Sequence, residues 1–368
     1  MAIIWVIIGI TILAIAVPFI LKMRNPKEVT LQELGISVLA SIVVTLICFA
    51  LFAMMVPRST EILNGQVTDK QRVRVSCSHA YSCNCYRSCS GSGSSRTCTT
   101  ICQTCYRHSY DVDWRVYNTI NHYINIDRIN SQGTRTPPRW NKVAVGEPFS
   151  IENSYVDYLK VSNTSVFNKR VVKEHPEYAE TIPSYPHVYD YYRVGLIRHT
   201  HPVSFDLNIW NDTLRDRLKV WGAKHQLNVV IVFTKHGPDF FEYLKNQWKG
   251  GRKNDAIVVL NVDEENNMLA WGNVFSWSKN ELFNTSIKAH LNSLEEFSLD
   301  NVMSILDQNV KHFERRPMEE FKYLLKDRTY AWWQILIVII LQLAVNVGVW
   351  YTISTNSVRN STFNYRRY

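Results

Sequence analysis

Apolar residues gather in three long runs near the two ends of the chain, with a polar block between them. Residues 2–21 and 36–56 contain no charged side chain, and residues 331–353 are interrupted mainly by three amides. A helix of about 20 apolar residues is long enough to cross the hydrocarbon core of a bilayer. The pattern therefore predicts three transmembrane helices.

Basic residues near these runs predict an orientation. Lys22 and Arg24 lie in the short segment between the first two runs, and Arg366 and Arg367 lie in the C-terminal tail. Short cytoplasmic segments are enriched in such residues. We therefore expect a multi-pass protein of the inner or plasma membrane, with the lipid bilayer as a partner. Its C-terminus would be cytoplasmic and its large domain extracytoplasmic, which means periplasmic in a bacterium.

The second half of the polar block alternates between helical and strand patterns. Residues 227–233 form a continuous apolar run, as in a strand that is buried on both faces. Residues 239–248 place Phe240, Leu244 and Trp248 at helical spacing, and Gly250-Gly251 follows where a helix would end. This alternation predicts a layered α/β domain. The expected elements are helix 212–225, strand 227–233, helix 239–248, strands 256–262 and 268–274, and helices 278–291 and 299–313.

The first half of the polar block has a different character. Residues 72–75 and 110–117 alternate as strands do, whereas residues 118–203 are rich in Pro, Tyr, Asn and Ser. We therefore expect a mostly β, cysteine-rich module before the α/β domain. The predicted divisions are 1–57 (two transmembrane helices), 58–117 (cysteine-rich β module), 118–203 (irregular β-rich segment), 204–330 (α/β domain) and 331–368 (transmembrane helix and tail).

Seven of the eight cysteines lie between residues 77 and 105. Outside the cytoplasm, closely spaced cysteines in a stretch with few aliphatic residues favour disulfides, each worth about 2–4 kcal/mol. An odd number leaves one thiol over, and Cys48 lies in a predicted membrane helix. The disulfide candidates are Cys77, Cys83, Cys85, Cys89, Cys98, Cys102 and Cys105.

Structural zinc is the alternative for the same cysteines. The spacing Cys102-x2-Cys105 is common among zinc ligands, and His79 and His108 flank the module. The sequence leaves this choice open. The cysteine candidates for zinc are Cys83, Cys85, Cys98, Cys102 and Cys105.

The formal net charge of +9 raises the question of nucleic-acid binding. Nucleic-acid-binding proteins concentrate Lys and Arg in a patch with interleaved aromatic residues. This chain has no dense run of that kind. We therefore expect no nucleic-acid partner.

Two amides in the last apolar run predict contacts between helices. Gln342 and Asn346 lie one helical turn apart and share a face. Unpaired amides in lipid are costly, so we expect both side chains to hydrogen-bond another helix. That helix belongs either to the same chain or to a second copy in a homo-oligomer.

Several stretches of the second half carry a family resemblance. The order of three stretches resembles that of the TPM domain. They are Val-Val-Ile-Val-Phe at 229–233, Phe241-Glu242-Tyr243-Leu244 with Trp248, and Trp271-Gly272. That family includes phosphatase-like domains of membrane-anchored proteins, and the resemblance covers about 204–313. The front half is similar to uncharacterised cysteine-rich membrane proteins of bacteria and their phages, through its cysteine spacing and Tyr-Asp-Val-Asp-Trp at 110–114.

The TPM resemblance implies candidate catalytic residues. The family signature is about Lys-Asp-Asn-Gly, and the matching residues here are Lys253-Asn254-Asp255-Ala256, with acid and amide exchanged. Asp255 would then present a carboxylate at the mouth of a strand, the usual ligand edge of an open α/β sheet. Asp206 or Asp212 matches the opening acidic residue of the family.

Three functions remain as expectations. The first is a membrane-tethered extracytoplasmic binding or assembly protein that acts on another membrane or envelope protein. The second is a metal-dependent, phosphatase-like hydrolase that uses Asp206 or Asp212 with Asp255 and a divalent ion. The third is an oligomeric, membrane-disrupting effector whose helices pack through Gln342 and Asn346. Whether the protein is an enzyme stays open, and structural zinc or a divalent ion is the expected cofactor if it holds one.

Overall fold

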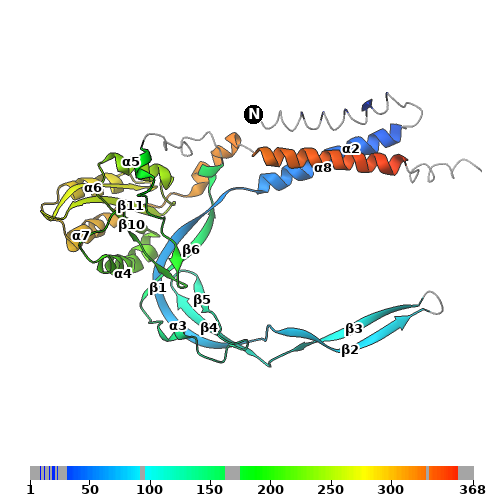
Figure 1. The fold of residues 1–368 in the computed structure, drawn as a ribbon, viewed down its shortest axis with the longest axis horizontal. Coiled ribbons are helices and arrows are strands. Elements are labelled where there is room, and N and C mark those ends of the chain that lie inside the picture. The colour runs from blue at the N-terminus through cyan, green and yellow to red at the C-terminus, as the bar shows by residue number, and fades with distance from the viewer. Residues whose placement is uncertain are drawn as a thin grey trace, which may run out of the picture. The chain divides into compact units, whose positions relative to one another are not determined.

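The computed structural model describes residues 31–91, 96–161, 175–328 and 331–354, with a few single positions before residue 24. Figure 1 shows the helices and strands of these residues. The chain divides into two compact units. Unit 1 comprises Met1–Ser59, Tyr155–Lys169 and Met318–Tyr368, and unit 2 comprises Thr60–Ser154 and Arg170–Pro317.

Two helices form most of the described part of unit 1. Helix α2 (Leu31–Met54) packs against helix α8 (Trp332–Ser354). Gln342 of α8 donates hydrogen bonds to the carbonyl oxygen of Ser41, at 2.9 Å, and to the hydroxyl of Thr45, both in α2. The helix that receives the amide of Gln342 thus belongs to the same chain. The short helices η2 (Tyr158–Lys160) and η6 (Met318–Asp327) also lie in this unit.

The prediction of three transmembrane helices is contradicted. Among the described residues, no helix is long and apolar enough to cross a membrane. The multi-pass localisation and the orientation depended on these helices and are corrected with them. Most of the first run, 2–21, and the side chain of Asn346 lie outside the described residues.

A four-stranded sheet opens unit 2. Its strands run in the order β5-β4-β1-β6, and the pairs β1–β4 and β4–β5 are antiparallel. In its core, Trp114 of β4 packs against Trp140 of helix α3 (Pro138–Asn141), and Phe149 of β6 stacks on Tyr192. This sheet joins strands from the two segments that the sequence analysis separated at residue 118. The strands are β1 (Arg58–Val75), β4 (Asp111–Asn118), β5 (His122–Ile126) and β6 (Pro148–Val156).

A hairpin of two further strands is inserted between β1 and β4. Strand β2 (Ala80–Ser90) pairs with strand β3 (Thr97–Tyr106) in antiparallel register. Strands β1 and β4 pair as far as Val75 and Asp111, so the hairpin starts where their ladder ends. We call residues 80–107 the cysteine hairpin and the flanking residues, 77–79 and 108–111, its root.

The second half of unit 2 is an α/β domain. Its sheet has the order β12-β11-β10-β9, in which β9, β10 and β11 are parallel and β12 is antiparallel. The predicted alternation of helices and strands is confirmed by the elements found. The strands are β9 (Ile197–His199), β10 (Asn228–Thr234), β11 (Asp255–Asp263) and β12 (Met268–Ser276). The helices are α4 (Leu207–His225), α5 (Asp239–Gln247), α6 (Leu282–Asn292) and α7 (Leu299–Asn309). Smaller elements are β7 (Val188–Tyr189), β8 (Arg193–Val194), η4 (Pro176–Tyr178) and η5 (Val310–His312).

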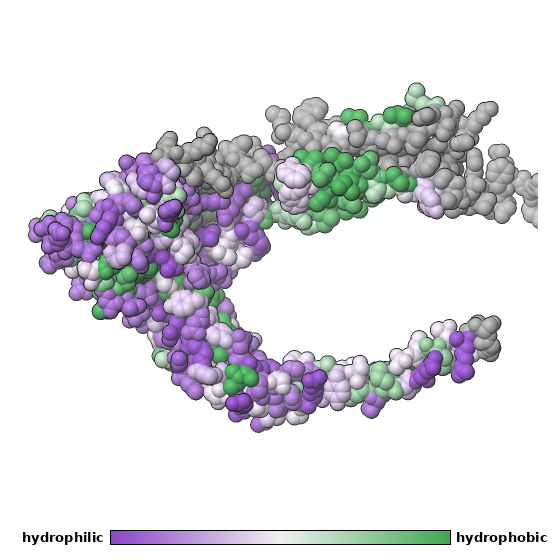
Figure 2. Space-filling view, viewed as in Figure 1, coloured by the Kyte–Doolittle hydropathy of each residue, from purple (hydrophilic) through white to green (hydrophobic). Residues whose placement is uncertain are grey.

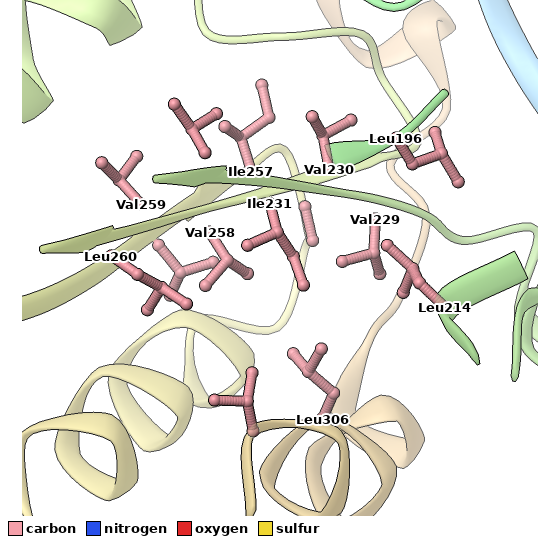
Figure 3. Close-up of a cluster of buried hydrophobic side chains, with 14 of the residues drawn as sticks. Leu196, Leu214, Val229, Val230, Ile231, Ile257, Val258, Val259, Leu260 and Leu306 are labelled. Atoms are coloured by element: carbon pink, nitrogen blue, oxygen red, sulfur yellow. The ribbon is translucent and has the colours of Figure 1, made fainter. Parts of the chain in front are cut away.

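The core of this domain surrounds strands β10 and β11. Every residue of β10 is buried, which explains its unbroken apolar sequence. Figure 3 shows side chains of β10 and β11 on both faces, with Leu214 of α4 and Leu306 of α7 among the residues that pack against them. The sheet is thus covered on both sides, as a parallel sheet requires.

Candidate functional site

The cysteine hairpin keeps almost none of its side chains away from solvent. Apart from a few half-buried positions, the residues of β2 and β3 are exposed. An isolated two-stranded ribbon is marginally stable at best in water, because it buries too little apolar surface. Something other than packing must therefore hold the hairpin.

Three disulfides supply that restraint. They pair cysteines across the two strands in nested order, with sequence separations of 22, 17 and 9 residues. Each closes a loop in the unfolded chain and is worth about 2–4 kcal/mol. All five cysteines considered for zinc are in these disulfides, so none offers a thiolate. The pairs are Cys83–Cys105, Cys85–Cys102 and Cys89–Cys98.

The exposed chemistry of the hairpin is aromatic and basic. Tyr81, Tyr86 and Tyr106 are 46%, 59% and 58% exposed, and Ile101 is 45% exposed. Residues 77–110 include three arginines and neither Asp nor Glu. Figure 2 shows mostly pale surface along β2 and β3, which corresponds to intermediate hydropathy. The surface is therefore suited to polar and aromatic contacts rather than to burial in a large apolar core.

Four side chains with ligand atoms meet at the root. Cys77 is not in a disulfide, and its Sγ lies 3.7 Å from Nδ1 of His108. His79 and His108 each place Nδ1 3.3 Å from a carboxylate oxygen of Asp111. Within the described part of the chain, these residues form the one group of this kind, with all ligand atoms within 4.8 Å of one another.

Asp111 is the anchor of this group. It is fully buried, and its Oδ2 accepts hydrogen bonds from the backbone N–H and hydroxyl of Ser78 and from Nη1 of Arg128, at 2.9, 3.0 and 2.8 Å. The Ser78 backbone N–H, with Arg128 and the Ser78 hydroxyl, holds the pKa of Asp111 well below its usual range despite burial. These donors therefore favour the ionised form of Asp111 at the root.

Sequence reasoning noticed His79 and His108 but missed Asp111, and it treated Cys77 as a disulfide candidate. The available signal was the pairing of two short motifs, Cys-x-His before the hairpin and His-x2-Asp after it. The odd number of cysteines pointed the same way, because one had to remain outside the disulfides.

Asp255 occupies a different kind of place. It is the first residue of β11 and pairs in register with Asn228, the first residue of the parallel strand β10. It therefore lies at the amino ends of these strands, whereas ligands of open α/β sheets bind at the carboxyl ends. Asp255 therefore does not lie at the ligand-binding edge of the sheet that the TPM resemblance implied.

The contacts of Asp255 tie structural elements together. Its carboxylate accepts hydrogen bonds from Nδ2 of Asn228 at 2.8 Å, from the backbone N–H of Arg252 at 2.7 Å, and from the hydroxyl of Tyr185. Burial raises its pKa to about 7, although the Arg252 N–H acts in the opposite direction. Nearby, Asn254 donates to the backbone oxygens of Ile62 and Gln226. These residues join β1, α4 and the α/β sheet.

The other two acidic candidates lie apart from Asp255. Asp206 caps the N-terminus of α4 by accepting from the backbone N–H of Asn208, and the side chain of Asp212 is 73% exposed beside Arg215. Asp255 lies near the opposite end of α4, where Gln226 ends the helix. At 1.5 Å per residue, about 20 Å or more of helix separates Asp212 from that end. The described contacts do not bring these carboxylates into one site.

Comparison with known proteins gives no match. No protein-family model, no curated protein and no solved structure matches this chain. The resemblance to the TPM domain therefore stays a prediction.

Proposed function

We propose that the protein is a binding or assembly protein that recognises another protein through the cysteine hairpin. The observation that carries this proposal is an exposed two-stranded ribbon held by three disulfides. The ribbon contributes almost nothing to a core, so its covalent restraint serves to keep an exposed surface in one conformation. A rigid surface loses less conformational entropy on binding than a flexible one.

The backbone of the hairpin supports the same proposal. In a two-stranded sheet each strand has a neighbour on one side only, so N–H and C=O groups remain open along both outer edges. An extended segment of a partner can add as a third strand at such an edge.

The side chains indicate the chemistry of the partner. Tyrosine and arginine are enriched at the centres of protein interfaces. The hairpin exposes Tyr86 and Tyr106, and its arginines, Arg87, Arg96 and Arg107, are exposed without a neighbouring acid in the hairpin sequence. We therefore propose an acidic extended segment of a protein as the ligand. No contact among the described residues favours the hydrolase alternative.

Site-specific crosslinking in cells tests this proposal. A photoreactive residue at Tyr86 should crosslink one stoichiometric partner, whereas the same residue at Val220, which is 64% exposed on α4, should not. Arg87→Glu should weaken capture of that partner at least about tenfold, because it places like charges in the contact. The matched control is Lys288→Glu on the exposed face of α6. Equal capture by wild type and Arg87→Glu, or crosslinks at Val220 alone, would refute the hairpin as the binding surface.

A further inference from the structure

We propose that Cys77, His79, His108 and Asp111 form a structural zinc site at the root of the cysteine hairpin. This site shares no cysteine with the zinc alternative weighed from the sequence, although His79 and His108 flanked that alternative too. It also goes beyond the proposed binding function, because it does not depend on any partner.

Three distances between ligand atoms are close to the edges of a tetrahedral zinc site. Zinc binds His nitrogen and carboxylate oxygen at about 2.0–2.2 Å and Cys sulfur at about 2.3 Å, so tetrahedral edges are about 3.3–3.4 Å for N to O and about 3.6 Å for S to N. The structure has 3.3 Å for His79 Nδ1 to Asp111 Oδ2, 3.3 Å for His108 Nδ1 to Asp111 Oδ1, and 3.7 Å for Cys77 Sγ to His108 Nδ1. The two histidines approach different oxygens of Asp111, and the four ligand atoms lie within 4.8 Å of one another, so small side-chain shifts would bring all four side chains onto one ion.

The arrangement does not fit a nucleophilic Cys-His-Asp triad. In a triad the thiol contacts one nitrogen of the imidazole and the carboxylate contacts the other. The imidazole takes the thiol proton at the first nitrogen, and the carboxylate stabilises the resulting positive charge from the second. Here Cys77 Sγ and Asp111 Oδ1 both approach Nδ1 of His108. Convergence on a single ring nitrogen is expected when all three atoms surround a common ion.

One nitrogen at the root lacks a hydrogen bond. Nδ1 of His79 is buried and, among the described residues, has no hydrogen-bond partner, although Asp111 Oδ2 is 3.3 Å away. Buried polar atoms in proteins nearly always have a partner, and a bound ion is one of the accepted explanations when they do not. A zinc ion would use the lone pair of this nitrogen.

The surroundings of Asp111 resemble an outer shell of a metal site. Ser78 and Arg128 donate to its Oδ2, which fixes the orientation of the carboxylate, as second-shell groups do for metal ligands. A thiolate and a carboxylate together cancel the charge of Zn²⁺, so the complete centre is neutral. The mixture of thiolate and imidazole favours zinc over magnesium or calcium.

The position of the site explains its role. Cys77 and His79 precede β2, and His108 and Asp111 follow β3, so an ion would link the two chain ends of the hairpin below its three disulfides. Four protein ligands close the coordination sphere, which is typical of structural rather than catalytic zinc. Ser78 and His79 also line an open cleft of about 690 Å³, through which an ion can reach the root.

Metal analysis of the full chain tests the site. We expect one zinc per chain, and a thiolate-to-metal charge-transfer band when Co²⁺ replaces zinc. Cys77→Ser and His108→Gln should each lower zinc affinity by more than about 100-fold, because loss of an outer-shell partner alone costs about 10–100-fold. The matched controls are Cys48→Ser, which removes the other cysteine outside the disulfides, and His187→Gln, which changes an exposed histidine; both should retain one zinc.

Two measurements keep the test valid if a ligand variant folds poorly. Disulfide mapping shows whether the three pairs form in each variant. In the wild-type chain, zinc should protect Cys77 from alkylation, and a chelator should restore its reactivity. A wild-type chain that binds no zinc, or unchanged zinc affinity in both Cys77→Ser and His108→Gln, would overturn the proposal.

Discussion

The cysteine hairpin and the α/β domain lie in the same unit but are stabilised by different means. In the α/β domain, β10 and most of β11 are buried between helices, so apolar burial supplies the stability. In the hairpin, almost every side chain faces solvent, and three disulfides restrain two strands that share no core. Covalent restraint leaves the hairpin surface free for recognition, whereas the residues of the buried sheet are committed to packing.

This difference predicts the largest effect for a substitution in the α/β core. Phe233 of β10 is 1% exposed and makes ring contacts with Phe205, Trp210 and Phe297. Phe233→Ala should lower the free energy of unfolding by about 3–5 kcal/mol, because it removes apolar contacts and leaves a cavity. Urea denaturation followed by circular dichroism measures the change.

The hairpin provides the matched control for that substitution. Tyr86 is 59% exposed, and Tyr86→Ala should change the free energy of unfolding by less than about 0.5 kcal/mol. Similar decreases in the free energy of unfolding for Phe233→Ala and Tyr86→Ala would show that the hairpin also depends on side-chain packing.

Removal of a disulfide should have the next largest effect, and it should be local. Replacing Cys85 and Cys102 together by Ala opens the middle cross-link, which joins residues 17 apart, and should cost about 2–4 kcal/mol of local stability. Hydrogen exchange should accelerate in β2 and β3 and stay unchanged in β10 and β11. Faster exchange in β10 would contradict the separation of the two regions. The same pair replaced by Ser is a second variant that controls for side-chain polarity.

The sequence predicted the α/β domain better than the front half for a physical reason. The run 229–233 is apolar throughout because both faces of β10 are buried, so local composition carries the signal. The sheet β5-β4-β1-β6 depends on pairing between distant residues, such as Val75 with Asp111, and no local pattern reports that.

The candidate site was predictable only in part. The cysteine content indicated cross-links, and the structure gives their pairing between β2 and β3. The root group needs Cys77 and Asp111 to approach each other across the inserted hairpin, which the sequence does not encode locally. Asp255 immediately precedes the predicted strand 256–262, so the chain direction alone puts it at the amino end of that strand, away from the usual ligand edge.

The contact between the four-stranded sheet and the α/β domain offers a smaller test. Gly222 of α4 lies against Asn64 of β1, and a Cβ atom there would be 2.4 Å from the Asn64 carbonyl oxygen. Gly222→Ala should therefore destabilise the protein by about 1–3 kcal/mol, even though alanine favours helices. Thermal unfolding measures this change. Gly237→Ala is the control, because a Cβ atom at Gly237 has nothing within 4 Å. A stabilised Gly222→Ala would mean that α4 and β1 separate easily.

The last test concerns a buried carboxylate and its dependence on pH. Asp255 has a pKa of about 7 in the folded protein, against 3.8 for an unperturbed carboxyl, because burial disfavours its charge. Between these values the folded state binds more protons than the unfolded state. The free energy of unfolding should therefore fall as pH rises from about 4 to about 7, by at most about 1.4 kcal/mol per pH unit from this group. Urea titrations at pH 5 and pH 7.5 measure the difference, which Asp255→Asn should reduce and the exposed control Asp212→Asn should leave unchanged.

Asp111 is equally buried but has a lowered pKa, because Ser78 and Arg128 donate to its charged form. If Asp255→Asn kept the full pH dependence, Asp255 would be ionised like Asp111, and its polar neighbours would outweigh burial in the α/β domain too.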